Sequence, residues 1–110
     1  MLVTEEIAAP AMDLLRKHFE VVQGSGPDHV AAELAGCVGI LIRMAHVTAE
    51  DMAKNPQLRV IAKHGMGLDK IDVEEATRRG IAVVNTPWSN SNAVAEHIVM
   101  FLLSLSKRTV

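Results

Sequence analysis

Short apolar runs alternate along the chain with longer segments in which apolar residues recur at helical spacing. The short runs each predict a β-strand, and they lie at residues 2–3, 19–22, 38–42, 59–63 and 81–84. The longer segments predict helices, at residues 10–18, 28–34, 48–55 and 72–80. This alternation of strand and helix indicates an α/β protein with a doubly wound parallel sheet of about five strands.

Several residues mark where the predicted helices begin and end. Pro10 suits the first turn of a helix, where its missing N–H costs nothing. Asp28 is expected to cap the second predicted helix. Asp72 and Glu75 resemble a capping box at the start of the fourth, and Gly80 is expected to end it.

The last predicted helix, at residues 93–105, is apolar nearly all round. It carries one charged residue, Glu96, and its apolar positions do not form a single stripe. A helix of this kind is buried on most sides. A five-stranded sheet covers only one side of it, so we expect the rest to contact another domain or another subunit.

Ligands of doubly wound sheets bind outside the carboxyl ends of the strands. In this chain those ends place Arg43 and Met44 after the third strand, residues 63–67 after the fourth and residues 85–87 after the fifth. We therefore expect these three segments to share one edge of the sheet.

The loop Lys63-His64-Gly65-Met66-Gly67 is the strongest candidate for chemistry. Two glycines one residue apart let the backbone turn sharply and approach a ligand closely. Unpaired N–H groups at such a turn favour an anion, and Lys63 and His64 add positive charge. The loop is a candidate seat for a carboxylate or phosphate, although the same pattern also suits a plain strand-to-helix connection.

The loop does not match a dinucleotide fingerprint. That motif requires Gly-x-Gly-x-x-Gly leading directly into a helix. Lys70 stands where the third glycine is needed, and the next helix-start signal is Asp72.

Composition and charge further narrow the classes of protein to which the chain could belong. The 110 residues carry a formal net charge of −2, and the basic residues are scattered, which argues against a nucleic-acid surface. A lone Cys37 allows no internal disulfide. No signal-peptide pattern or membrane-length apolar run is present, so we expect a cytoplasmic protein with no membrane partner. The five histidines lack the spacing of a zinc site, so no metal is expected.

The segment at residues 58–72 carries a resemblance to a known family, together with residues 80–87, Asn90 and residues 94–97. These motifs, in this order, resemble the D-isomer-specific 2-hydroxyacid dehydrogenases, and the match is phosphoglycerate dehydrogenase-like. The resemblance implies a flavodoxin-like substrate-binding domain at residues 1–92. It also implies an interdomain and dimer-interface helix at residues 93–110, with the Rossmann NAD-binding domain absent from this chain.

The resemblance also implies roles for individual residues. The backbone amides of His64, Gly65 and Met66 would hold the carboxylate of a small 2-hydroxy or 2-oxo acid, within a binding loop that runs to Gly67. Met66 would also touch the nicotinamide of NAD or NADP. The family's catalytic Arg, Glu and His have no counterpart here, so no catalytic residue is expected and the chain alone should be inactive.

Two basic residues complete the implied substrate site. Lys63 matches a position close to the substrate, and Arg43 matches an Arg near the substrate phosphate. Met44 and Ala45 stand where hydroxyl residues are common, which leaves the identity of the 2-hydroxy acid open. The resemblance also implies a homodimer.

The alternative is a non-catalytic, flavodoxin-like regulatory or ligand-binding domain such as a signalling receiver. Glu5 and Glu6 after the first strand could supply a receiver's acidic pair. The acceptor Asp is missing, because the third strand ends at Ile42 and Arg43.

Overall fold

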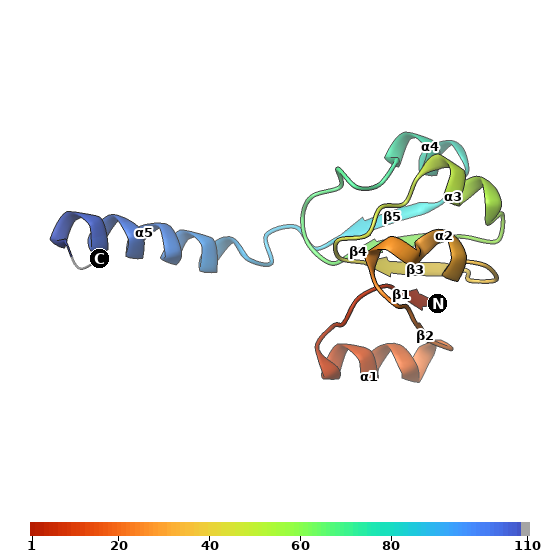
Figure 1. Ribbon diagram of the computed structural model, residues 1–110, viewed down its shortest axis with the longest axis horizontal. Coiled ribbons are helices and arrows are strands. Elements are labelled where there is room, and N and C mark those ends of the chain that lie inside the picture. The colour runs from red at the N-terminus through yellow and green to blue at the C-terminus, as the bar shows by residue number, and fades with distance from the viewer. Residues whose placement is uncertain (109–110) are drawn as a thin grey trace.

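The computed structural model describes residues 1–108, which form an α/β domain followed by a projecting helix (Figure 1). Five parallel strands lie in the order β2-β1-β3-β4-β5, which is the flavodoxin-like order. They are β1 (Leu2–Val3), β2 (Val22–Gln23), β3 (Gly39–Ile42), β4 (Val60–Lys63) and β5 (Ala82–Asn85). The fold class predicted from the sequence is confirmed.

Six helical segments connect and follow the strands. They are α1 (Ala9–His18), the 3₁₀ turn η1 (Pro27–His29), α2 (Val30–Glu33), α3 (Ala49–Lys54), α4 (Val73–Arg78) and α5 (Ser91–Lys107). The helices that follow β2, β3 and β4 pack together on one face of the sheet, and α1 lies on the other (Figure 1).

Alternation along the strands decides which side chains form the core. Ile40 and Ile42 of β3 and Ile61 of β4 are fully buried against α2, α3 and α4. Their neighbours Leu41, Ala62 and Val84 point to the face of α1. That second face is only partly covered, since Val84 remains 50% exposed.

Two local predictions from the sequence are wrong. The second strand is Val22–Gln23 rather than residues 19–22, because β1 is only two residues long and pairs with these two alone. Asp28 caps no helix: it lies inside η1, and the turn is entered from Gly26 with a φ of 133°.

The starts of α3 and α4 both carry side-chain caps. Thr48 and Asp51 form a reciprocal capping box at α3. At α4 the Asp72 carboxylate accepts from the Glu75 N–H at 2.9 Å. The other half of the predicted box is absent, since the Glu75 side chain binds Arg78 and Arg79 instead.

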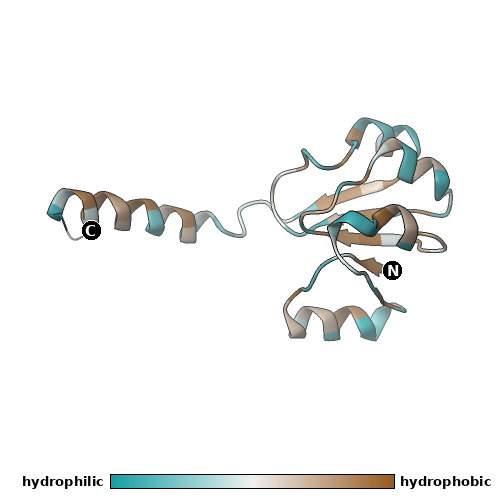
Figure 2. Cartoon of the chain, in the orientation of Figure 1, coloured by the Kyte–Doolittle hydropathy of each residue, from teal (hydrophilic) through white to brown (hydrophobic). Residues whose placement is uncertain are grey.

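Helix α5 leaves the domain rather than folding back on the sheet (Figure 1). None of its residues is buried, although Ile98, Phe101, Leu102 and Leu105 are all apolar. Figure 2 shows brown, apolar positions along the whole projecting helix. Within residues 1–108, no helix is long and apolar enough to span a bilayer.

Candidate functional site

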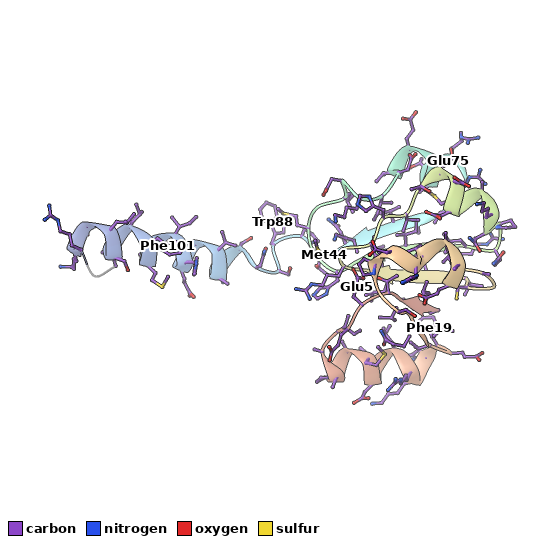
Figure 3. All side chains as sticks on the ribbon, viewed as in Figure 1. Glu5, Phe19, Met44, Glu75, Trp88 and Phe101 are labelled. Carbon is purple, nitrogen blue, oxygen red and sulfur yellow. The ribbon has the colours of Figure 1, made fainter. Side chains whose placement is uncertain are left out.

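The turn after β3 lies at the carboxyl edge of the sheet and is held by Glu5 (Figure 3). Thr4 is fully buried, and its N–H donates to the Leu41 carbonyl at 3.1 Å, which extends the β1–β3 pairing. Glu5 follows directly, so its carboxylate reaches past the end of β3. There it accepts hydrogen bonds from the N–H groups of Arg43 (2.9 Å), Met44 and Ala45 (3.0 Å).

The carbonyl groups of the same turn are also engaged. The Lys63 ammonium donates to the Arg43 carbonyl, and the Lys70 ammonium donates to the Met44 carbonyl at 2.8 Å. The turn therefore has an anion on its amide side and two cations on its carbonyl side. The guanidinium of Arg43 and the side chain of Met44 remain exposed at the edge.

The glycine loop follows β4 at the same edge. Gly65 has a φ of 127°, a conformation that side chains rarely adopt. A Cβ placed there would meet only Lys63 Cε, at 3.9 Å. The loop therefore requires glycine because of its backbone angle, and not because space is short in the free protein.

The structure shows which loop amides are already bonded within the protein. The His64 N–H donates to the Ile42 carbonyl at 2.8 Å and so belongs to the sheet. The Gly65 N–H donates to the Thr86 hydroxyl at 3.0 Å, a partner that can rotate away. Within residues 1–108, the N–H groups of Met66 and Gly67 have no hydrogen-bond partner.

The last residue of β5 and the residue after it form hydrogen bonds with the glycine loop. Thr86 N–H donates to the Gly65 carbonyl at 3.1 Å, and the Asn85 amide donates to the Met66 carbonyl at 2.8 Å. Bonds to its carbonyl groups thus hold the loop in place, while the N–H groups of Met66 and Gly67 stay without a partner within residues 1–108.

A cavity of about 240 Å³ adjoins the loop on the α1 face of the sheet. Its walls are apolar and its rim is polar, and it is lined by Ile7, Ala8, Ala11, Leu41, Ala62, Lys63, His64, Val84, Asn85 and Thr86. Of the sequence-predicted site residues, the structure brings Lys63 and His64 together here. Arg43 is linked to them through the bond from Lys63 to its carbonyl.

The surroundings of the Glu5 carboxylate favour its charged form in the turn. Partial burial alone would raise the pKa of Glu5. The hydrogen bonds from Thr4, Arg43, Met44 and Ala45 outweigh that effect and hold its pKa below the ordinary value of 4.5. Sequence reasoning missed this role of Glu5, and the available signal was an acidic residue placed directly after a buried strand.

This use of Glu5 also bears on the receiver alternative. A receiver's acidic pair must be open to a metal ion, whereas the Glu5 carboxylate is already bonded to three amides. Within residues 1–108, no three His, Cys, Asp or Glu side chains lie close enough together to hold a metal.

The glycine loop and the starts of α3 and α4 do not fit a dinucleotide. Such a site places the pyrophosphate on a free helix N-terminus after a glycine-rich turn. Asp51 and Thr48 already bond the start of α3, and Asp72 bonds the start of α4. The glycine loop itself leads into a turn at residues 69–70 before any helix begins.

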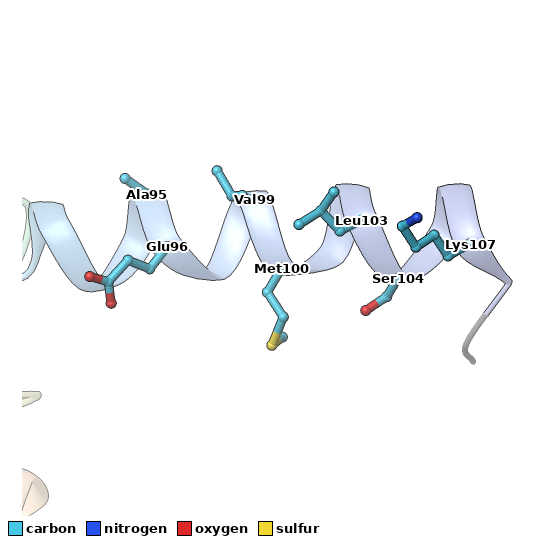
Figure 4. A pocket seen from close by; sticks show the side chains of 7 residues that line it. All are labelled: Ala95, Glu96, Val99, Met100, Leu103, Ser104 and Lys107. Atoms are coloured by element: carbon cyan, nitrogen blue, oxygen red, sulfur yellow. The ribbon is translucent and has the colours of Figure 1, made fainter.

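Helix α5 carries a separate shallow, mostly apolar surface, with Ala95, Val99 and Leu103 along one side, Glu96, Met100 and Ser104 along the other, and Lys107 near its end (Figure 4). A single helix forms this surface, so it is an open face and not an enclosed ligand cavity.

Taken together, a parallel sheet in the order 2-1-3-4-5, with a glycine loop at its carboxyl edge, defines a flavodoxin-like α/β domain. The model of the D-isomer specific 2-hydroxyacid dehydrogenase catalytic domain matches residues 1–105. The chain belongs to this family.

Relatives named for different activities match nearly the whole chain. D-3-phosphoglycerate dehydrogenase of Mycobacterium tuberculosis is 37% identical over 111 residues, which cover 98% of this chain and 21% of the relative. Glyoxylate reductase of Thermococcus gammatolerans is 36% identical over 116 residues, covering 100% and 35%. The chain thus spans about a fifth to a third of these relatives.

Solved structures agree with the fold. A protein from Thermus thermophilus superposes with a TM-score of 0.86 at 32% identity, over 99% of this chain and 37% of that one. D-lactate dehydrogenase from Aquifex aeolicus, complexed with NAD and lactic acid, gives a TM-score of 0.83 at 26% identity, over 98% and 34%.

Proposed function

We propose that this chain supplies the substrate-binding segment of an NAD(P)-dependent D-2-hydroxyacid dehydrogenase. Such an enzyme transfers hydride between nicotinamide and C2 of a 2-hydroxy or 2-oxo acid. The observation that carries the proposal is the pair of free N–H groups of Met66 and Gly67, at the carboxyl edge of a chain matched to this family over residues 1–105.

In this proposal the loop binds the acid's carboxylate through Met66 and Gly67 N–H, which favour an anion. Gly65 N–H can join them when the Thr86 hydroxyl rotates away. The Lys63 ammonium adds positive charge beside the adjoining cavity, which His64 also lines. The exposed guanidinium of Arg43 would bind a second anionic group, such as a phosphate, on substrates that carry one.

The nucleotide is assigned to a second domain. When bound, NAD or NADP supplies the hydride chemistry, and Met66 would contact its nicotinamide. Residues 1–92 act as the substrate-binding domain, and residues 93–110 form the segment toward the second domain and a partner subunit in a homodimer. Residues 109–110 of that segment lie outside the described residues. We place the enzyme in the cytoplasm because its lone Cys37 suits a reducing compartment.

A ¹H–¹⁵N NMR titration of the 110-residue chain tests the proposal. Glycolate and 3-phospho-D-glycerate should both shift the Met66 and Gly67 amide signals saturably, and only the phosphorylated acid should shift Arg43. NAD⁺ alone should shift none of them saturably. The proposal is contradicted if neither acid moves the loop amides while the spectrum shows a folded domain.

A further inference from the structure

Three consecutive backbone N–H groups converge on one side chain in the turn after β3. Arg43, Met44 and Ala45 all donate to the Glu5 carboxylate. Glu5 lies 38 to 40 positions earlier in the chain. Successive amides that point into one concavity form a nest, which is an arrangement that binds anions.

The nest is held in place independently of the anion. On the opposite side of the turn, Lys63 and Lys70 donate to the carbonyl groups of Arg43 and Met44. Ala45 is fully buried and belongs to the hydrophobic core. These contacts keep the three N–H groups aligned even when their acceptor is changed.

We propose that residues 43–45 form an anion-binding nest whose resident ligand is the Glu5 carboxylate. When that carboxylate is removed, the nest takes a small free carboxylate of the acetate class. In the intact protein the nest is closed to substrate, and Glu5 is a positioning residue that fixes the turn carrying Arg43. This last role rests on the proposed function.

Chemical rescue tests the nest. In Glu5→Ala, the amide signals of Arg43, Met44 and Ala45 should shift away from their positions in the unmodified chain. Added sodium acetate should return them toward those positions saturably. Acetate should leave these signals unmoved in the unmodified chain and in Glu6→Ala, since Glu6 is exposed and makes no hydrogen bond within residues 1–108.

The test also works if Glu5→Ala unfolds. A ligand that binds only the folded state stabilises it, so acetate should then raise the folded fraction of Glu5→Ala more than sodium chloride does. Acetate and chloride should act alike on Glu6→Ala. No acetate-specific response in Glu5→Ala, by either shift or folded fraction, overturns the nest.

A second variant separates the effect of a side chain that occupies the nest from the effect of the carboxylate charge. Glu5→Gln keeps the side chain's size, so it should fill the nest and abolish the acetate response. A saturable acetate response in Glu5→Gln would contradict the assignment. Because acetate acts at residues 43–45, a failed rescue is distinguishable from a failure of Met66 and Gly67 to bind substrate acids.

Discussion

Glu5 is the side chain whose loss should affect the site's stability most directly. Its charged carboxylate accepts from three amides and the Thr4 hydroxyl. Hydrogen bonds to charged groups are each worth up to a few kcal/mol, but partial exposure reduces this. We expect Glu5→Gln to lower the free energy of unfolding by about 1–2 kcal/mol at pH 7, measured by urea denaturation.

The same carboxylate should make stability depend on pH. Because the folded pKa of Glu5 lies below its ordinary value of 4.5, its contribution is fully present above pH 4.5 and is lost as pH falls through the folded pKa. The stability gap between the unmodified chain and Glu5→Gln should therefore shrink in acid. Glu6→Gln serves as the control, and a gap that persists undiminished at low pH would refute the charged role.

Residue roles at the edge could be predicted only in part. The glycine loop was found from two glycines after an apolar run. The internal partners of the His64 and Gly65 N–H groups could not be predicted, because they are Ile42 at the end of β3 and Thr86 just after β5. Glu5 was missed for the same reason, since its contact with residues 43–45 depends on β1 lying beside β3.

Helix caps test the account at the scale of single elements. Asp72 caps α4 through the Glu75 N–H, whereas Asp28 makes no capping bond. We expect Asp72→Ala to destabilise the domain by about 1 kcal/mol and Asp28→Ala to change it by less than about 0.5 kcal/mol. Equal effects in thermal or urea unfolding would contradict the cap assignment.

Strand positions were predicted well for β3, β4 and β5 and poorly for β2. β3, β4 and β5 lie within one residue of their predicted bounds, because each contains a continuous apolar run. β2 is an edge strand with both residues exposed, so its apolar signal is weak. Pairing with β1 fixes its position instead.

At the scale of the whole molecule, α5 carries an exposed apolar surface, which we expect a partner to cover. Large exposed apolar patches mark interaction sites. We expect the chain to self-associate as its concentration rises, measured by sedimentation velocity. Leu102→Glu should weaken the association.

Leu14→Glu is the matched control for that experiment. Leu14 lies on α1 and is 57% exposed, close to the 62% of Leu102 on α5. The two substitutions therefore add the same charge at similarly exposed leucines. Equal weakening by both, or none by Leu102→Glu, would argue against α5 as the contact face.

The chain alone should show no NADH- or NADPH-dependent turnover of glyoxylate or of other 2-oxo acids. Within residues 1–108, the glycine loop and the starts of α3 and α4 do not form a pyrophosphate site. A spectrophotometric assay of the absorbance of reduced nicotinamide measures this. Turnover that scales with chain concentration would show that residues in this segment suffice for the chemistry.

The affinity of the glycine loop for an acid tests the central claim most directly. Gly65 and Gly26 both have positive φ, 127° and 133°, and a methyl group at either meets no close neighbour. The strain that alanine would introduce is therefore similar at the two positions, but only Gly65 shapes the loop that presents the Met66 and Gly67 N–H groups. We predict that Gly65→Ala weakens 3-phospho-D-glycerate binding by at least about tenfold, or about 1.4 kcal/mol, while Gly26→Ala leaves it unchanged. Equal affinities for the two variants would contradict the account.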